Sequence, residues 1–415
     1  MNSTAKPSVM FLSDMCVLDR NSGAAIEMLD WLSMLSANGY ASSSVTMSLF
    51  DGAEEYPFQM EIVPSVAPND HIGSRIRLNR DGVEHNIFNV GTSIGRNVSP
   101  ELVSKFIASA AEDIRRIRPS VVIGYGSRNL GPLRKLARDL GASTIFYLAN
   151  DSYTVEKRDC FASIDEIVTP SNALSKLYKD RLGFDCCVIG NYLKDFTDLK
   201  KPTSEEVSLR RKTGFVTMVN PSLVKGGLFF LQIAAVMEKL APNLTFLSIE
   251  SRITREQMEG YVNNASSLKN VWWVQRQSDM HRVYQRSSLL LMPSLWFEAA
   301  GRIVPEAQMH GIPVLAHRVG ALPDQMGNGG ELFDIPDRLA GKFGLLPTPQ
   351  EIAPWVSTIT AMLGDDKQYK TMSRRALKAA AASHDPKIRA KQIMAFIDKQ
   401  SDSALIRATD VEMVS

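Results

Sequence analysis

Residues 289–316 read LLLMPSLWFEAAGRIVPEAQMHGIPVLA. The apolar runs at the two ends of this stretch predict buried strands. Between them, Pro305 fits the first turn of a helix, where its missing N–H costs nothing, and Gly311 marks the helix end. Two strands joined by a loop and a helix indicate a parallel α/β sheet. The loop then lies at the carboxyl end of the first strand, where open sheets of this kind bind ligands.

The same alternation of short apolar runs and helical periods extends along most of the chain. It predicts strands at 9–12, 44–49, 121–125, 144–148, 166–169, 187–189, 215–219, 244–249, 271–274, 289–292 and 314–316. It predicts helices at 24–37, 100–116, 130–140, 227–240, 279–286, 304–310 and 386–400. Strands that alternate with helices in this way indicate parallel sheets with helices on both faces, which is a doubly wound, Rossmann-like arrangement.

The length of 415 residues exceeds what one hydrophobic core usually organises, so we expect two domains of roughly 200 residues each. The stretch 192–213 is rich in charges, contains a proline and breaks the alternation, which predicts a linker between domains. We therefore expect an N-terminal domain over 1–195 and a C-terminal domain over 196–385. The segment 386–415 is expected to form a helix that packs back on the N-terminal domain, followed by a frayed tail.

The 47 basic and 45 acidic residues give a net charge of +2, which does not indicate a nucleic-acid-binding protein. Basic residues do gather locally, and solvated helix and loop faces are the favoured interpretation. The alternative is a weak peripheral contact with an anionic membrane. The clusters are Arg75, Arg77 and Arg80; Arg115, Arg116 and Arg118; and Arg128, Arg134, Lys135 and Arg138.

The cysteine pattern and the N-terminal sequence indicate a cytoplasmic protein. The four cysteines, at 16, 160, 186 and 187, lack metal-ligand spacing, and the adjacent pair suits no disulfide framework. The first residues do not show the charged, apolar and small-residue succession of a signal peptide. The longest apolar stretches are also shorter than the ~20 residues that span a bilayer.

Two carboxylates flank the predicted helix start in the quoted stretch. Glu298 lies in the loop and Glu306 in the first helical turn, while Gly301 lets the backbone approach a ligand closely. The unpaired N–H groups at a helix start favour an anion. Carboxylates beside an anion site are explained if each one binds hydroxyls. A nucleotide sugar has that chemistry, because a diphosphate joins its hydroxylated sugar to its hydroxylated ribose.

This stretch resembles the Glu-x₇-Glu signature of glycosyltransferase family 4, whose members are retaining enzymes of the GT-B fold. The resemblance includes Pro-Ser before the first glutamate, Gly-Arg after it, and Gly-Ile-Pro-Val at the end. It implies two Rossmann-like domains that face each other across a cleft. It also implies that Glu298 binds donor-sugar hydroxyls, that Glu306 binds the ribose, and that backbone amides over 299–303 face the sugar and diphosphate. The last group comprises Ala299, Ala300, Gly301, Arg302 and Ile303.

A second stretch, FVTMVNPSLVKGG at 215–227, resembles the family's donor-phosphate loop, in which a lysine neutralises the diphosphate. The matching lysine is Lys225, which could otherwise be an ordinary surface charge. The family usually has an arginine five residues earlier, where this chain has Asn220. We expect Arg252 or Arg302 to supply the missing positive charge.

Candidate residues in the N-terminal half are less specific. Ser22 and Gly23 lie where the family has a glycine-containing loop near the donor phosphate and the acceptor, but Ser22 could equally be a helix N-cap. Many family members have a histidine where this chain has GYGSRN, with Tyr125. Asn150 could line the acceptor site, although a turn residue is the favoured interpretation.

The resemblance implies transfer of a sugar from a UDP- or GDP-sugar to an acceptor hydroxyl, with retention of configuration and without a metal or other cofactor. The residues expected to act in the reaction are Lys225 and Glu298. The acceptor class stays open among carbohydrates, lipid-linked sugars, small molecules and proteins. Two alternatives remain: another GT-B activity such as sugar-nucleotide epimerisation, and a non-catalytic nucleotide-sugar-binding protein.

Overall fold

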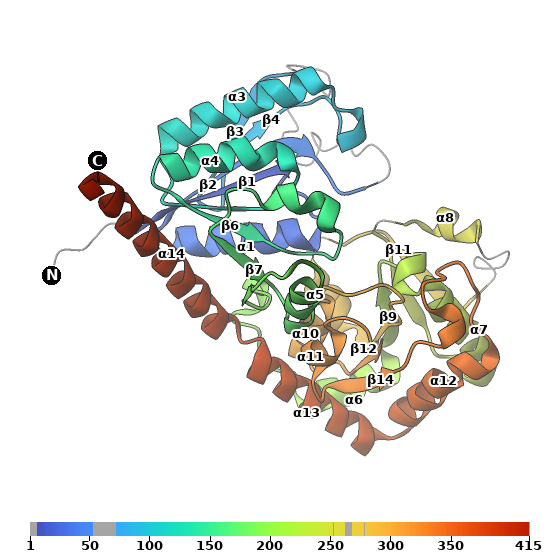
Figure 1. The fold of residues 1–415 in the computed structure, drawn as a ribbon. Coiled ribbons are helices and arrows are strands. Elements are labelled where there is room, and N and C mark those ends of the chain that lie inside the picture. The colour runs from blue at the N-terminus through green and yellow to red at the C-terminus, as the bar shows by residue number, and fades with distance from the viewer. Residues whose placement is uncertain (1–5, 53–71, 252, 262–267, 278, 415) are drawn as a thin grey trace. The chain divides into compact units, whose positions relative to one another are not determined.

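The computed structural model of the protein contains two compact units (Figure 1). One comprises Met1–Lys194 with Pro386–Ser415, and the other comprises Asp195–Asp385. We call them the first and the second unit. Within them, the structure describes residues 6–52, 72–251, 253–261, 268–277 and 279–414, with side chains described as far as Ala404.

The first unit is built on a sheet in the strand order β3-β4-β2-β1-β5-β6-β7-β8. The strands are β1 (Ser8–Met15), β2 (Ala41–Leu49), β3 (Arg75–Arg80), β4 (Val83–Phe88), β5 (Val121–Gly124), β6 (Ser143–Tyr147), β7 (Glu166–Thr169) and β8 (Cys187–Val188). All neighbours are parallel except β3 and β4. The chain passes from β1 outward to β2, then returns to add β5 on the other side of β1, so the direction of winding reverses between β1 and β5.

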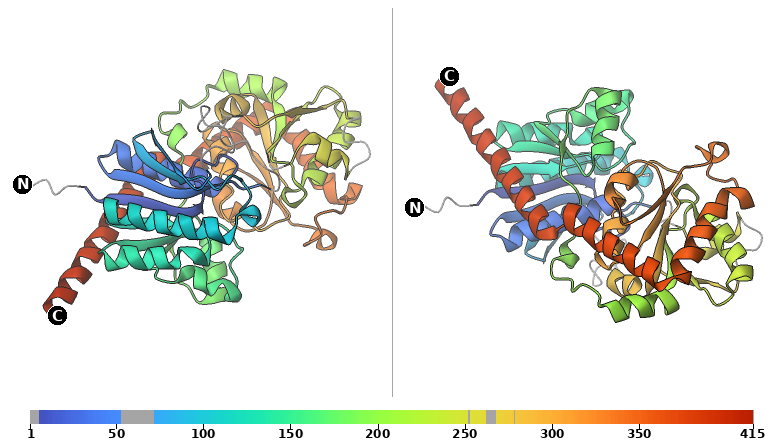
Figure 2. Two further views of the ribbon diagram at one scale, coloured as in Figure 1. Left: turned by 90° about the horizontal axis from the view of Figure 1, so that it is seen from above. Right: turned by 90° about the horizontal axis from the view of Figure 1, so that it is seen from below.

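Helices cover both faces of this sheet (Figure 2). They are α1 (Gly23–Ala37), α3 (Pro100–Ile117), α4 (Gly131–Asp139), α5 (Asn172–Leu182) and α14 (Pro386–Val414). Alternate residues of β1 explain the two layers: Val9 and Phe11 pack in a core with α1 and α14, whereas Met10 and Leu12 pack in a core with α3 and α4. Period-two burial on both faces is the property expected of a central parallel strand.

The hairpin β3–β4 is absent from the sequence-based prediction. Asp81 and Gly82 connect the two strands with φ values of 53° and 75°, which suit a two-residue hairpin turn. The Asp-Gly pair was the available signal. Many of the basic residues of this region form ion pairs: Arg75, Arg77 and Arg116 all lie within 4 Å of the buried Asp113 carboxylate. These arginines thus neutralise a buried carboxylate, a structural role that the interpretation as solvated faces did not include. A contact with an anionic membrane stays a prediction.

The second unit contains a parallel sheet in the order β11-β10-β9-β12-β13-β14. Its strands are β9 (Phe215–Val219), β10 (Phe246–Ile249), β11 (Val271–Val274), β12 (Ser287–Met292), β13 (Val314–His317) and β14 (Gly330–Phe333). Its helices are α6 (Ser204–Thr213), α7 (Gly227–Leu240), α8 (Arg255–Glu259), α9 (Met280–Gln285), α10 (Ile303–Met309), α11 (Leu322–Met326), α12 (Pro349–Gly364) and α13 (Asp366–Ser383). Winding reverses between β9 and β12. The two α/β sheets therefore confirm the predicted fold class.

Half of the predicted linker is instead a helix of the second unit, so that prediction was wrong for 204–213. Helix α6 starts in a capping box formed by Thr203 and Glu206. Arg210 of this helix is 7% exposed and donates to the carbonyl oxygens of His310 and Gly311 at 2.8 and 3.0 Å. The charges that suggested a linker thus include one that fastens the helix to its own unit.

The C-terminal segment is helical over Pro386–Val414, beyond the point near residue 401 where a frayed tail was expected. Helix α14 contacts α1, β5 and β6 of the first unit. Tyr40 donates to Asp398 at 2.8 Å, and Ser143 donates to Gln400 at 3.2 Å.

No helix in the described part of the chain combines the length and apolar character that crossing a membrane requires.

Candidate functional site

The candidate site lies at the carboxyl ends of β9 and β12, where the winding of the second sheet reverses. Open α/β sheets bind ligands at such a point because the loops that follow the two strands diverge there. The loop after β9 leads through a short turn of 3₁₀ helix, Leu223–Lys225, into α7. The loop after β12 leads into α10. Both stretches singled out in the sequence therefore meet at this edge.

Backbone contacts join the two loops directly. The amides of Leu295 and Trp296 donate to the carbonyl oxygen of Val224 at 2.9 and 3.1 Å. Gly226 has a φ of 82°, and a Cβ atom built on it would lie 1.9 Å from the carbonyl oxygen of Pro293. Only glycine satisfies both the left-handed conformation and this close approach. These contacts hold the two loops together, so the main-chain positions from which their side chains extend are fixed.

Lys225 and Glu298 meet across this junction. The Lys225 Nζ atom lies 2.6 Å from Oε1 and 2.7 Å from Oε2 of Glu298. The Glu298 side chain is 5% exposed, whereas that of Lys225 is 27% exposed. Within the described residues, Lys225 is the one hydrogen-bond partner of the Glu298 carboxylate. A buried carboxylate is thus paired with a cation that solvent can still reach.

The backbone of Glu298 is held by the turn that follows β13. Its carbonyl oxygen accepts a hydrogen bond from the amide of Ala321 at 2.7 Å. Gly320, with a φ of 54°, packs so closely that a Cβ atom there would lie 2.3 Å from the same oxygen. These contacts fix the main chain from which the Glu298 side chain extends.

The residues between the two glutamates lie at the start of α10. Gly301 has a φ of 60°, and its carbonyl oxygen accepts the amide of Val304 at 2.9 Å. Within the described chain, the amides of Ala300, Gly301 and Ile303 donate no hydrogen bond. These three residues are partly exposed. Their N–H groups are therefore available to oxygen atoms of an anion.

Glu306 is held by two donors. The hydroxyl of Tyr284 donates to its Oε2 at 2.7 Å, and Nε of Arg302 donates to its Oε1 at 2.9 Å. Tyr284 is fully buried, and both burial and the Glu306 charge raise the pKa of its phenol well above the usual value. The phenol thus stays a donor near neutral pH. An ionised carboxylate accepts about four hydrogen bonds, so Glu306 retains capacity for a ligand.

The predicted end of the helix is confirmed. The amide of Gly311 donates to the carbonyl of Gln308 at 2.8 Å, and that of Ile312 donates to Ala307 at 3.1 Å. Gly311 has a φ of 68°, as this type of helix termination requires. Beyond this end, Nδ1 of His281 lies 3.0 Å from Nε2 of His310, and burial is the main cause that lowers the pKa of His310 to about 3.

Asn220 and the two proposed substitute cations have different environments. Asn220 follows β9 with a φ of 58°, and its buried Oδ1 atom has no hydrogen-bond partner among the described residues. Arg302 is committed through Nε to Glu306. Arg252 lies outside the described residues. The source of the second positive charge therefore stays a prediction.

The candidate residues of the first unit follow different strands of its sheet. Ser22 and Gly23 come after β1 and Tyr125 after β5, the two strands at the winding reversal, whereas Asn150 comes after β6. Ser22 occupies the N-cap position of α1 but makes no side-chain capping bond, and a Cβ atom on Gly23 would meet nothing within 4 Å. Asn150 accepts from both the amide and the hydroxyl of Ser152, at 3.0 and 2.6 Å, as a turn residue does. Ser22 thus has the N-cap position without the capping bond, and Asn150 has the hydrogen bonds of a turn residue. The binding roles expected for both residues stay predictions.

Tyr125 stands beside two polar residues, one of which sequence reasoning missed. Asp14, at the end of β1, accepts the amide of Ser127 through Oδ2 at 3.1 Å. The buried atoms Asp14 Oδ1, Tyr125 Oη and Ser127 Oγ have no hydrogen-bond partner in the described chain. Burial raises the pKa of Tyr125 well above its usual value. Asp14 could have been found as the polar residue that ends the first apolar strand.

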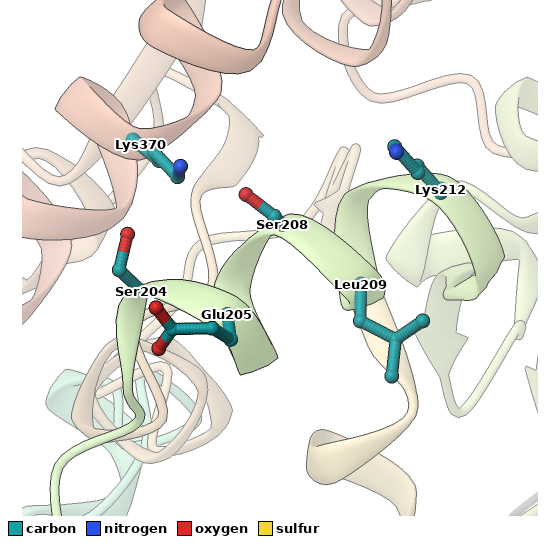
Figure 3. Close-up of a pocket in the computed structure, with 6 residues that line it drawn as sticks. All are labelled: Ser204, Glu205, Ser208, Leu209, Lys212 and Lys370. Carbon is teal, nitrogen blue, oxygen red and sulfur yellow. The ribbon is translucent and has the colours of Figure 1, made fainter.

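Tyr284 was also missed, because nothing in the local sequence distinguishes it from a core tyrosine. Its contact with Glu306 joins α9 to α10 through a hydrogen bond between residues 22 positions apart, which is a tertiary contact. A further feature, a surface hollow of about 330 Å³, lies on α6 and is bordered by Lys370 of α13 (Figure 3). None of the predicted site residues lines it. In the part of the chain that the structure describes, no three His, Cys, Asp or Glu side chains are grouped as a metal site.

Comparison with known families identifies the segment that carries this site. Residues 209–379 match the family model described as "Glycosyl transferases group 1". A D-inositol 3-phosphate glycosyltransferase from Nocardia farcinica is 34% identical over 100 residues, which are 24% of this chain and 19% of that protein. The chain thus matches about a fifth of the length of this curated relative.

Solved structures resemble the whole chain. HepE from Anabaena, in complex with UDP and glucose, has a TM-score of 0.66 at 15% identity, with 94% of this chain and 99% of that chain covered. Sucrose-phosphate synthase from Thermosynechococcus elongatus has a TM-score of 0.67 at 14% identity, with 96% and 100% covered. These likenesses show the fold, which is the GT-B fold of glycosyltransferases with two Rossmann-like units.

Proposed function

We propose that this protein is a glycosyltransferase that moves a sugar from a nucleoside diphosphate sugar to an acceptor hydroxyl. The observation that carries the proposal is the junction of two loops in the second unit. It combines a reachable lysine, unpaired amides at a helix start, and two glutamates held at different points along the same loop and helix. The group 1 family match over 209–379 and the GT-B fold support the same assignment.

In the proposed mechanism, each part of the junction binds one part of the donor. Lys225 and the amides of Ala300, Gly301 and Ile303 bind the diphosphate and stabilise the charge that develops as it leaves. Glu298 accepts hydroxyls of the donor sugar. Glu306 accepts the ribose hydroxyls through the capacity that Tyr284 and Arg302 leave unused. Phosphate recognition thus also lowers the barrier, because charge on the diphosphate increases in the transition state.

The finer assignment follows from the Glu-x₇-Glu resemblance. We propose a family 4 enzyme that retains the anomeric configuration and requires neither a metal nor another cofactor. Attack by the acceptor then occurs on the face from which the diphosphate departs, without a covalent enzyme intermediate. The first unit is proposed to bind the acceptor, within glycan or glycoconjugate biosynthesis in the cytoplasm. UDP-sugars are the first donors to test, because HepE was solved with UDP and with UDP-glucose.

The test is a thermal unfolding screen with UDP- and GDP-sugars, followed by transfer assays with the donor that stabilises the protein. A ligand at 100 times its Kd adds about 2.7 kcal/mol of stability, which a melting curve detects readily. We expect one nucleotide base to stabilise the protein and its sugar to move to an acceptor. Conversion of the donor to an isomer without any acceptor would instead indicate an epimerase. Binding without reaction in a broad acceptor screen would indicate a non-catalytic binding protein.

A further inference from the structure

The ion pair between Lys225 and Glu298 competes with the ligand contacts that are proposed for the same two residues. Lys225 is assigned to the diphosphate and Glu298 to the sugar, yet the structure shows them bound to each other through both carboxylate oxygens. If a phosphate binds Lys225, the Glu298 carboxylate loses its partner, although its side chain is only 5% exposed. Leaving a buried charge unpaired is strongly unfavourable. The ligand must therefore supply a replacement.

The geometry indicates which partner moves. The Glu298 main chain is fixed by Ala321 and by the close approach of Gly320. Lys225 has a flexible four-carbon stem, and its side chain is 27% exposed. We therefore expect the ammonium group to turn toward a bound diphosphate while the Glu298 carboxylate stays in place and needs new donors.

We propose that the Lys225–Glu298 pair makes this protein discriminate between an intact nucleotide sugar and the nucleoside diphosphate that remains after transfer. The inference rests on the proposed function. An intact donor satisfies both partners, because its diphosphate binds Lys225 and its sugar hydroxyls donate to Glu298. A nucleoside diphosphate without the sugar takes the lysine and leaves the carboxylate unpaired. The pair thus favours binding of the substrate and release of the product.

The experiment compares three ligands that share the nucleotide base found by the screen: the nucleotide sugar, the nucleoside diphosphate, and its methyl ester on the terminal phosphate. The methyl ester has the same diphosphate charge as the nucleotide sugar and lacks the sugar hydroxyls. Titration calorimetry on the wild-type protein should show at least about tenfold tighter binding of the nucleotide sugar than of the methyl ester. Equal affinities would overturn the proposal, and this comparison requires no variant.

The Glu298→Gln variant gives a result of opposite sign for the two ligands. Without the carboxylate, Lys225 is no longer held, so we expect the methyl ester to bind about five- to tenfold tighter than to the wild type. The nucleotide sugar should bind more weakly than to the wild type, so the ratio of the two affinities falls toward one. A methyl ester affinity that is unchanged or weaker in a folded variant would overturn the proposal.

Glu331→Gln is the matched control, because Glu331 is an exposed carboxylate on the edge strand β14 of the same unit. It removes the same charge and should leave all three affinities within about twofold of the wild-type values. Tighter binding of the methyl ester in both variants would show a general effect of removing a negative charge. It would overturn the inference that the Lys225–Glu298 pair causes the discrimination. A wild-type protein that binds no nucleotide sugar would contradict the proposed function itself. Normal binding without the opposite shifts in Glu298→Gln would contradict only this inference.

Discussion

The two units have the same kind of sheet and the same reversal of winding, but their polar groups at that point are organised differently. In the second unit, Lys225 pairs with Glu298, and Glu306 is held by Tyr284 and Arg302. In the first unit, three buried polar atoms, Asp14 Oδ1, Tyr125 Oη and Ser127 Oγ, have no partner in the described chain. The second unit thus presents charged groups that are already paired, although one buried atom at the same edge, Asn220 Oδ1, has no partner among the described residues. In the first unit, by contrast, all three of these buried atoms lack a partner in the described chain.

This contrast agrees with the proposed division of roles, in which the second unit binds the donor and the first unit binds the acceptor. A diphosphate flanked by two hydroxylated groups has the same layout in every nucleotide sugar, so a site for it benefits from preorganised charges. Acceptors differ in shape and in the position of the reacting hydroxyl. The following predictions test whether donor binding and transfer depend on the paired groups of the second unit. They also test whether changes to the three buried groups of the first unit leave donor binding unaffected.

The largest effect is expected from Lys225→Met, which removes the proposed phosphate ligand but keeps an apolar stem of similar length. Transfer, measured as kcat/KM, should fall about 10²- to 10³-fold, because charge on the leaving diphosphate loses its cation. Lys212→Met is the matched control, since Lys212 lines the surface hollow on α6 rather than the loop junction. Equal activity in the two variants would break the assignment of Lys225.

The next effect concerns the glycine that joins the two loops. Gly226→Ala should lower the free energy of unfolding by about 3 kcal/mol, because it adds a Cβ atom against the Pro293 carbonyl at a positive φ. Gly341→Ala has a similar φ of 69° and open space, and should cost about 1 kcal/mol. Gly23→Ala, at the first position of α1 in the first unit, should change the free energy of unfolding by less than about 0.5 kcal/mol, because a Cβ atom there meets nothing within 4 Å. Urea unfolding curves that rank the three variants otherwise would contradict this account.

Acid should weaken the second unit through buried neutral histidines. Burial lowers the pKa of His310 to about 3 and that of His317 to about 4. The unfolded chain therefore binds these protons first as the pH falls, near 6.5. The stability that neutral His310 and His317 contribute is complete above that pH and is lost as the pH falls toward 4 and then 3, by up to roughly 1.4 kcal/mol per pH unit for each proton.

Tryptophan fluorescence can follow this loss, because four of the five tryptophans lie in the second unit. Denaturant unfolding between pH 7 and 4.5 should show a falling free energy of unfolding. The slope should be smaller in a His317→Gln variant, which has one fewer group to protonate. A free energy independent of pH over that range would show that these histidines do not control the acid stability.

A smaller effect is expected from Tyr284→Phe, which removes one of the two donors that hold Glu306. Donor affinity should fall about five- to tenfold, because Glu306, the proposed ribose-binding carboxylate, is less well oriented. Tyr369→Phe is the matched control: Tyr369 is equally buried in the same unit, and its hydroxyl donates to the Ser288 carbonyl at 2.8 Å. Both variants should lose some stability, but donor affinity should change only in the first.

A 2′-deoxyribose form of the donor distinguishes two explanations for the effect of Tyr284→Phe. One is that Glu306 is less well oriented, and the other is that the whole site is less well ordered. If Tyr284 positions Glu306 for the ribose, the variant should lose less affinity for the deoxy donor than for the normal one. The same fractional loss for both donors would assign Tyr284 a structural role only.

The smallest effect is expected in the first unit. Asp14→Asn keeps an oxygen that can accept from the Ser127 amide. It removes a carboxylate whose other oxygen has no partner among the described residues. Donor affinity should stay within about twofold, and the free energy of unfolding should change by less than about 1 kcal/mol. A large loss of donor affinity would show that the contrast between the two units is not a division between donor and acceptor binding.

The sequence was most informative where function depends on local geometry. Pro305 and Gly311 fix the ends of α10, and the position of Glu298 relative to that helix follows from them. The pairing of Lys225 with Glu298 could not be read from the sequence, because it depends on hydrogen bonds that the amides of Leu295 and Trp296 donate to the carbonyl oxygen of Val224, far earlier in the chain. The contact of Tyr284 with Glu306 could not be predicted for the same reason. Helix α6 was not predicted because its charged residues resemble those of a linker.

The central claim is that the loops after β9 and β12 form one nucleotide-sugar site. A crystal structure of the protein with an intact nucleotide sugar tests it most directly. We predict a diphosphate oxygen within about 3 Å of the Lys225 Nζ atom, sugar hydroxyls on the Glu298 carboxylate, and ribose hydroxyls on Glu306. A nucleotide sugar bound elsewhere, with Lys225 still paired to Glu298, would contradict the claim.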